Sequence, residues 1–179
     1  LVDMYTLFPT RRLKDYQLMK YTNKHNVNSL NNKYNYLYYN PISKKIILVF
    51  NNYKTKKHYG QQVFDLLNES KKNNNLKEVK KGCIKLYKKI LIYIKENNFY
   101  EGKFVFSKKR NIPFNGFHYQ VSTAFEKVIG KPLSCNALRH AYISKYCINK
   151  KNNIVSCNMK EGIAYMMAHS NTMQARYTK

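Results

Sequence analysis

The sequence predicts an α+β domain that is mostly helical and carries one small three-stranded antiparallel sheet. Aromatic and β-branched residues are concentrated between positions 33 and 66, where turn signals divide them into runs of strand length. Apolar residues recur at helical spacing after that region and again in the final third of the chain. With 179 residues, 44% of them hydrophobic, the chain can bury one sizeable core. One domain over residues 1–179 is therefore expected.

The first helix is expected in the stretch "TLFPTRRLKDYQLMKY". Pro9 opens this helix and Thr10 caps it, because a small hydroxyl residue satisfies the amides of a first turn. The residues that then fall along one side are Leu13, Tyr16 and Lys20. The apolar residues before Pro9 resemble the end of a helix whose start is missing, so the chain is expected to be a fragment of a longer protein.

The sheet is expected next, as a meander of three antiparallel strands. Asn40 and Pro41 separate the first two runs of strand-forming residues, and a polar segment ending at Gly60 separates the second run from the third. The second hairpin is then the lysine-rich link between Phe50 and Gln61.

Helices are expected over most of the remaining chain. Apolar residues from position 76 keep helical spacing over about five turns, which indicates a core helix. A short "KFVFS" and a basic loop follow, and then a helix over "FHYQVSTAFEKVI" that Gly130 ends. Ser134 and Ser156 are expected to cap the last two helices.

The charge of the chain predicts a polyanionic partner. Lys and Arg number 33 against 9 Asp and Glu, which gives a formal net charge of +24 and strong self-repulsion unless an anion relieves it. An AT-rich coding sequence would explain many of the lysines, but not the scarcity of acids. Double-stranded DNA is therefore the expected partner.

A membrane partner and a secreted location are not expected. The sequence contains no apolar run of about 20 residues and no secretory signal before its first polar segment. The four cysteines are scattered, without the spacing of a zinc site, so neither disulfides nor a metal are predicted. A reduced intracellular setting follows, which for a viral protein would be the nucleus or a viral factory of the host cell.

Several polar residues at the edges of the expected elements have chemistry in common. They are Arg12, the hairpin lysines, Arg139, His169 and Tyr177. Two guanidinium groups, an ammonium and an imidazole would form a cationic pocket for one phosphate whose charge rises during a reaction. A tyrosine hydroxyl beside that pocket could attack the phosphorus.

The motifs that carry these residues resemble those of the tyrosine recombinases, the phage-integrase-like family. "CNALRHAYISKYC" and "IAYMMAHSNTMQARYT" are similar to its two C-terminal boxes, with Arg139, His169 and Tyr177 in the family's order. "PTRRLKDY" is similar to the first box and places the first arginine at Arg12, with an acid three positions later. Composition resembles that of integrases of large DNA viruses and virophages.

The family's hairpin lysine falls in "NNYKTKKHYGQQ", where Lys54 is the first choice and Lys56 and Lys57 are alternatives. Where the family most often has His or Lys three positions before the second arginine, this chain has Asn136. An amide can hydrogen-bond a phosphate, but it cannot carry a proton near neutral pH. Other basic residues expected to contact the DNA backbone are Lys56, Lys57, Lys108, Lys109 and Arg110.

The resemblance implies a recombinase catalytic-domain fold and a metal-independent and cofactor-independent reaction. Tyr177 would attack a DNA phosphodiester and form a 3′-phosphotyrosyl link. Arg12 and Arg139 would hold the nonbridging oxygens, Lys54 would protonate the departing 5′ oxygen, and His169 would donate to a phosphate oxygen.

The family also implies parts that this sequence does not contain. Its members carry an N-terminal core-binding domain that closes around DNA, and they assemble into a synaptic tetramer on DNA in the full-length protein. The present fragment, taken alone, is expected to be a monomer.

Two other functions remain open at this point. A type IB topoisomerase would share the arginine, lysine and tyrosine chemistry, and a non-catalytic basic nucleic-acid-binding module would keep only the charge. Structural alternatives exist as well for single residues. Arg139 would then be a buried structural residue, His169 a helix-end histidine bonded to backbone, and Lys54 part of a solvated basic turn.

Overall fold

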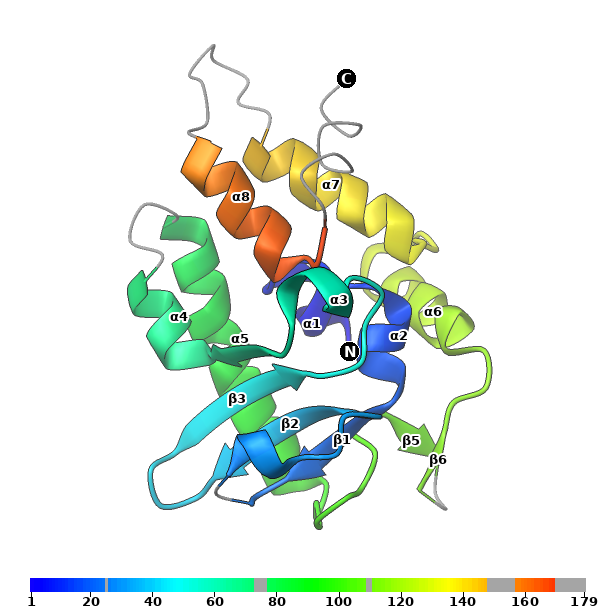
Figure 1. The fold of residues 1–179 in the computed structure, drawn as a ribbon. Coiled ribbons are helices and arrows are strands. Elements are labelled where there is room, and N and C mark those ends of the chain that lie inside the picture. The colour runs from blue at the N-terminus through cyan, green and yellow to red at the C-terminus, as the bar shows by residue number, and fades with distance from the viewer. Residues whose placement is uncertain (25, 73–76, 109–110, 148–156, 170–179) are drawn as a thin grey trace.

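The computed structural model describes residues 1–24, 26–72, 77–108, 111–147 and 157–169. In these ranges the fold is α+β, with more helix than strand, as predicted (Figure 1). The helices are α1 Val2–Thr6, α2 Leu13–Gln17, α3 Lys56–Tyr59, α4 Leu66–Lys72, α5 Lys77–Glu96, α6 Phe117–Ile129, α7 Cys135–Cys147 and α8 Cys157–Met166, with a 3₁₀ turn at Val27–Ser29. The strands are β1 Met19–Thr22, β2 Asn35–Asn40, β3 Lys45–Phe50, β4 Gln62–Asp65, β5 Ser107–Lys108 and β6 Ile112–Pro113.

The main sheet has four strands in the order β1-β2-β3-β4. Strands β2, β3 and β4 form the predicted antiparallel meander, with Leu37 opposite Leu48 and Leu48 opposite Phe64. Strand β1 was not predicted, and it lies parallel to β2 with Met19 opposite Asn35. The prediction of three strands is therefore correct for the meander and incomplete for the sheet.

The first helix is shorter than predicted, which explains the extra strand. Helix α2 begins after Arg12 and ends at Gln17, and the chain is extended from Met19 onward. Thr10 does not cap it, because its hydroxyl donates to the carbonyl of Tyr5 at 2.9 Å. Met19 is fully buried in the core. The strand conformation places its side chain there, whereas a continued helix α2 would not.

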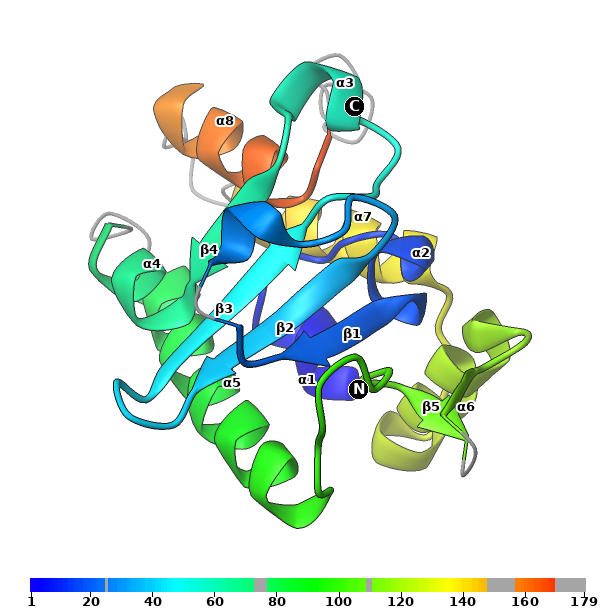
Figure 2. The ribbon, with the colours of Figure 1, turned by 60° about the horizontal axis from the view of Figure 1, so that its bottom comes forward.

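Helix α5 fills the core beneath the sheet, as its periodicity predicted (Figure 2). The residues of its inner face are Val79, Cys83, Leu86, Ile90 and Ile94, all buried. At Gly82 the helix meets the turn after α1 so closely that a β-carbon would lie 2.2 Å from the Leu7 carbonyl oxygen. Only glycine permits this backbone contact without a shift of one of the two segments.

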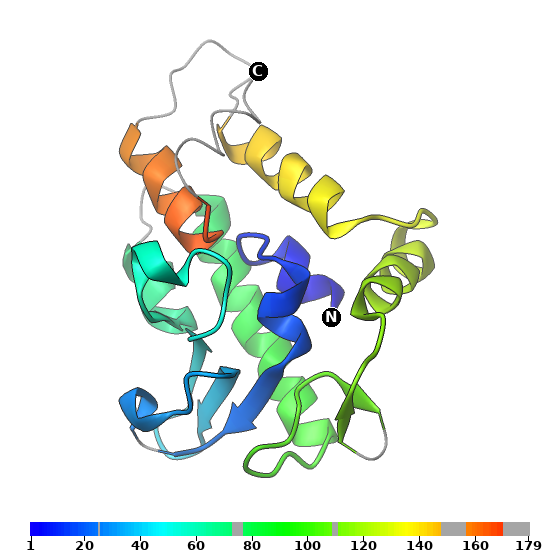
Figure 3. The same ribbon diagram turned by 45° about the vertical axis from the view of Figure 1, so that its right-hand side comes forward.

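Helices α7 and α8 lie on the far side of α1 and α2 from the sheet (Figure 3). Helix α6 ends at Gly130, which has a φ of 73°, as predicted. Ser134 caps α7 through a 3.1 Å bond from the Ala137 amide to its hydroxyl, also as predicted. Ser156 lies outside the described residues. None of the helices within the described ranges is long and apolar enough to cross a membrane.

Candidate active site

The segment that follows α8 holds the predicted His169 in the interior of the domain. Residues 166–169 are all buried, and His169 is only 1% exposed. Ala168 adopts a left-handed conformation with a φ of 51°, which turns the chain so that the His169 amide donates to the Ala164 carbonyl at 2.8 Å. The predicted Ala168-His169 motif is therefore the C-terminal cap of α8.

Side chains from distant parts of the sequence bind the backbone of this cap. Five successive carbonyls, residues 165 to 169, each accept a hydrogen bond from one side chain. The donors are Gln62 to Tyr165 at 2.7 Å, Arg11 to Met166 at 2.8 Å, Arg139 to Met167 at 3.3 Å, Thr55 to Ala168 at 3.0 Å, and Tyr59 to His169 at 2.5 Å. Carbonyls at a helix C-terminus lack partners in the helix and carry partial negative charge, so cationic and polar donors stabilise them. The cap joins α2, α7 and the β3–β4 hairpin at one place.

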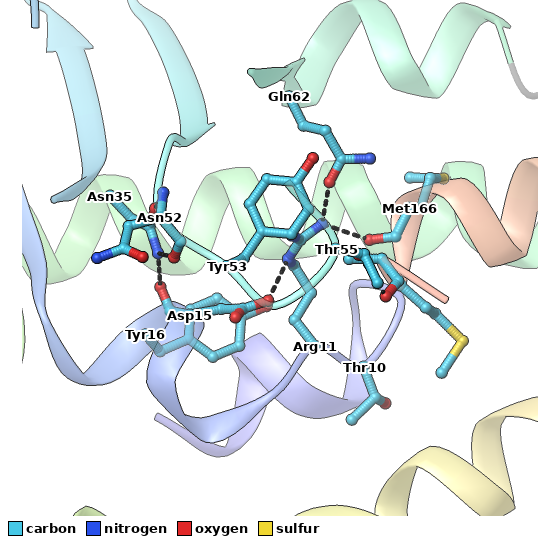
Figure 4. A network of polar contacts seen from close by, with 12 residues as sticks. Thr10, Arg11, Asp15, Tyr16, Asn35, Asn52, Tyr53, Thr55, Gln62 and Met166 are labelled. Carbon is cyan, nitrogen blue, oxygen red and sulfur yellow. Dashed lines mark hydrogen bonds and ion pairs between the residues drawn. The ribbon is translucent and has the colours of Figure 1, made fainter. Parts of the chain in front are cut away.

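Arg11 occupies the centre of one buried polar network (Figure 4). Its Nε donates to Asp15 at 2.9 Å, and its Nη1 donates to Gln62 Oε1 at 2.8 Å and to the Met166 carbonyl. Its guanidinium carbon lies 3.7 Å from the centre of the Phe50 ring. We call Arg11, Asp15 and Gln62 the Arg11 network.

Sequence reasoning missed Arg11, although a local signal was present. The acid that the motif associates with Arg12 is Asp15, but in the structure Asp15 forms its ion pair with Arg11, four positions before it. The sequence signal is an Arg and an Asp four positions apart, although Arg11 precedes α2 and the ion pair is buried rather than on a helix surface. Burial raises the pKa of Asp15, and the charge of Arg11 offsets part of that rise.

Arg12, Arg139 and His169 form a second group, which we call the cationic cluster. Arg12 is half-buried at the start of α2, and Arg139 is 2% exposed on α7. Burial, and then the charges of Arg139 and Arg12, lower the pKa of His169 to about 3. The two guanidinium groups therefore act on the same imidazole, which is neutral at neutral pH.

The two arginines of the cationic cluster have different hydrogen bonds. Arg139 donates to the carbonyls of Thr10 at 2.9 Å and Met167 at 3.3 Å. The buried Nε of Arg12 has no hydrogen-bond partner among the described residues. Both acceptors of these Arg139 bonds are backbone carbonyls, which carry no net charge.

The three candidate lysines lie on the hairpin loop that contacts the α8 cap. This loop, residues 51–61, joins β3 to β4, and Lys54 is exposed on it. Lys56 is half-buried and Lys57 is exposed, both on α3. The bonds of Thr55 and Tyr59 to Ala168 and His169 bring this loop beside the cationic cluster.

The structure places the other predicted residues in different regions. Asn136 is exposed on α7, one turn before Arg139 and therefore on the same side of that helix. Lys108 lies on β5, away from α8 (Figure 1). Tyr177, Lys109 and Arg110 lie outside the described residues.

The gathered groups are suited to an oxyanion. Two guanidinium groups offer paired N–H donors, and a neutral imidazole offers one more, which suits the tetrahedral oxygens of a phosphate. Within the described residues, no group of three or more His, Cys, Asp or Glu is placed to hold a metal ion.

No protein-family model matches this sequence, and no characterised protein or solved structure is significantly similar to it. The family resemblance of the motifs therefore stays a prediction.

Proposed function

We propose that this chain is the catalytic domain of a tyrosine recombinase, a site-specific recombinase or integrase that cleaves and rejoins DNA through a 3′-phosphotyrosyl intermediate. One observation carries the proposal. Arg139 of α7 bonds the backbone of both the Arg12 motif and the His169 motif, through the carbonyls at positions 10 and 167. The hairpin that carries Lys54 is bonded to the carbonyl of His169. These bonds support a single site formed by motifs far apart in the chain.

In the proposed ground state, Arg12 and Arg139 hold the nonbridging oxygens of one DNA phosphate. Their donors bind more strongly in the transition state, because negative charge on those oxygens rises as the pentacoordinate phosphorus forms. His169, with its pKa lowered to about 3, acts as a neutral hydrogen-bond donor rather than as an acid. A bound phosphate would raise that pKa by its negative charge.

In the proposed cleavage step, the phenol oxygen of Tyr177 forms a bond to phosphorus and the bond from phosphorus to the 5′ oxygen breaks. The phenol proton passes to water or another base, since the Asn136 amide does not take up a proton near neutral pH. The Lys54 ammonium gives a proton to the departing 5′ oxygen. A second 5′-hydroxyl reverses the step without a metal or a nucleotide cofactor.

The proposed partner is double-stranded DNA inside the cell. A net charge of +24 favours binding to the phosphate backbone and predicts affinity that falls steeply with salt. We also propose that the full-length protein assembles into a synaptic tetramer on DNA, whereas this domain alone is a monomer.

A nicked suicide duplex tests the reaction, because loss of the short cleaved strand traps the covalent intermediate. The native chain is expected to form a denaturation-resistant adduct, and Tyr177→Phe is expected to form none. Tyr119→Phe is the matched control, because Tyr119 is 67% exposed on α6, outside the proposed site. An adduct that persists in Tyr177→Phe would exclude Tyr177 as the nucleophile.

Burial at the site favours a second candidate, a non-catalytic nucleic-acid-binding module. Arg139 and His169 are 2% and 1% exposed, and Arg139 donates to two backbone carbonyls, as a structural arginine does. Such a module would show salt-dependent DNA binding and no adduct in the native chain. The same suicide-substrate assay therefore separates the two candidates.

A further inference from the structure

We propose that Thr55 and Tyr59 are positioning residues that hold the Lys54 hairpin against the His169 segment, so that proton donor and phosphate-binding groups are placed as one unit. This inference rests on the proposed function and adds two residues that no motif singles out.

The geometry of the hairpin is the first observation. Thr55 Oγ1 donates to the Ala168 carbonyl at 3.0 Å, and the Tyr59 hydroxyl donates to the next carbonyl, that of His169, at 2.5 Å. The ring of Tyr59 also packs edge-on against Tyr165 of α8, with ring centres 5.5 Å apart. Two adjacent peptide groups of the cap are thus bound by one short loop.

The loop is also braced internally by two hydrogen bonds. The Tyr53 hydroxyl donates to the Gly60 carbonyl at 2.7 Å, and Gln61 Nε2 donates to Asn51 Oδ1, also at 2.7 Å. These bonds join the two ends of the loop on either side of the lysines. Contacts at Thr55 and Tyr59 therefore determine where the whole loop, including Lys54, lies.

The two hydrogen bonds oppose an electrostatic repulsion between the loop and the cationic cluster. Lys54 is exposed on the loop, and like charges on Lys54, Arg12 and Arg139 repel one another before an anion binds. The hydroxyls of Thr55 and Tyr59 are neutral and add no charge to the site. They donate to the carbonyls of Ala168 and His169. They hold a cationic loop near a cationic cluster, which charge alone would not do.

A purely structural role for the two hydroxyls predicts a different result from a positioning role. If they only stabilise the fold, their loss weakens every activity of the domain equally. If they position Lys54, their loss slows only reactions that need a proton delivered to the leaving group. A 5′-bridging sulfur removes that need, because a thiol is far more acidic than an alcohol and departs as thiolate.

The experiment measures the rate of adduct formation on two nicked suicide duplexes, one with the normal 5′-bridging oxygen and one with sulfur. Thr55→Val and Tyr59→Phe, singly and together, remove the hydroxyls with little change in shape. Thr55→Ser keeps the hydroxyl at position 55 and removes only a methyl group. The control is Tyr87→Phe, which removes a 2.8 Å hydroxyl bond to the Lys44 carbonyl at the other hairpin of the same sheet.

The double variant is expected to react about 10- to 100-fold more slowly on the oxygen substrate, the effect of misplacing a reacting group. On the sulfur substrate it is expected to stay within about twofold of the native rate, since no proton is required. Thr55→Ser is expected to recover most of the loss caused by Thr55→Val. Tyr87→Phe is expected to match the native chain on both substrates.

Equal slowing on both substrates, in a variant whose circular dichroism shows a folded domain, would overturn the proposal, and so would native rates on the oxygen substrate. If the double variant unfolds, the single variants decide between the same outcomes, since each loses one bond. A native chain that forms no adduct on either substrate would instead overturn the proposed function, and this inference with it.

Discussion

Arg11 and Arg12 are neighbours in the sequence, yet they belong to regions of opposite character. The charge of Arg11 is paired with Asp15, and its guanidinium lies over the rings of Phe50 and Tyr53, although Arg11 Nη2 and Asp15 Oδ1 have no hydrogen-bond partner among the described residues. Arg12 belongs to the cationic cluster, and it forms no ion pair within the described residues. The buried ion pair of Arg11 indicates a structural role, whereas Arg12 is the arginine that we propose to bind an external phosphate.

The largest expected difference between the two regions is in stability. Arg11→Met leaves the buried Asp15 carboxylate without its partner and is expected to lower the free energy of unfolding by about 3–5 kcal/mol. Arg12→Met, at a half-buried position, is expected to change it by less than about 1 kcal/mol. Urea unfolding followed by circular dichroism measures both free energies of unfolding. Equal losses in the two variants would contradict the difference between the two regions.

Substitutions in the cationic cluster are expected to lower the rate of adduct formation more than the affinity for DNA. Arg139→Lys keeps the charge but loses the planar fork, so adduct formation should fall by about 10²- to 10³-fold. DNA affinity, which sums many backbone contacts, should stay within about threefold. Rates on the suicide duplex and a titration of labelled DNA test this, with thermal unfolding to verify the fold. An unchanged rate would argue against Arg139 as a phosphate ligand.

Acid should lower the stability of the folded domain through protonation of His169 in the cationic cluster. The pKa of His169 is lowered to about 3 from an unfolded value of 6.5, so the unfolded chain binds the proton more tightly. Stability present above pH 6.5 is then lost as pH falls toward 3, by roughly 4 kcal/mol. His169→Gln should flatten this part of the curve of unfolding free energy against pH. A curve that keeps its slope in the variant would assign the pH dependence to other groups.

The smallest effect concerns the turn that presents His169. Ala168 has a φ of 51°, a region that glycine occupies without strain, so Ala168→Gly should stabilise the domain by about 0.5 kcal/mol. Ala164→Gly is the control, because this residue lies inside α8 and the same change should destabilise there by about 1 kcal/mol. Thermal denaturation measures both signs. Destabilisation by both changes would mean that the buried Ala168 methyl outweighs its strain.

Local sequence signals predicted the elements whose causes are local. The periodicity of α5, the end of α6 at Gly130 and the cap of α7 at Ser134 each depend on residues close in the chain. The turn at Asn40 and Pro41 likewise marked the hairpin between β2 and β3. Strand β1 was missed because its helix-like pattern was overridden by burial of Met19 and pairing with β2.

For the candidate site, motif order predicted a neighbourhood of Arg139 and the His169 segment, which the Arg139 bond to the Met167 carbonyl shows, but not the other contacts around that segment. Arg11 bonds to Met166, 155 positions later, and Thr55 bonds to Ala168, 113 positions later. Nothing in a local window indicates such partners. The different environments of Arg11 and Arg12 also follow from the fold, since the sequence does not indicate which guanidinium lies over the Phe50 and Tyr53 rings.

Gly82 has a consequence for the position of the two neighbouring arginines. With 2.2 Å between a hypothetical β-carbon and the Leu7 oxygen, two main chains touch where even one methyl group cannot fit. Three residues separate Leu7 from Arg11, so contact with helix α5 fixes the start of the segment that leads to Arg11 and Arg12. A missing side chain in the hydrophobic interior thus limits where both guanidinium groups can lie.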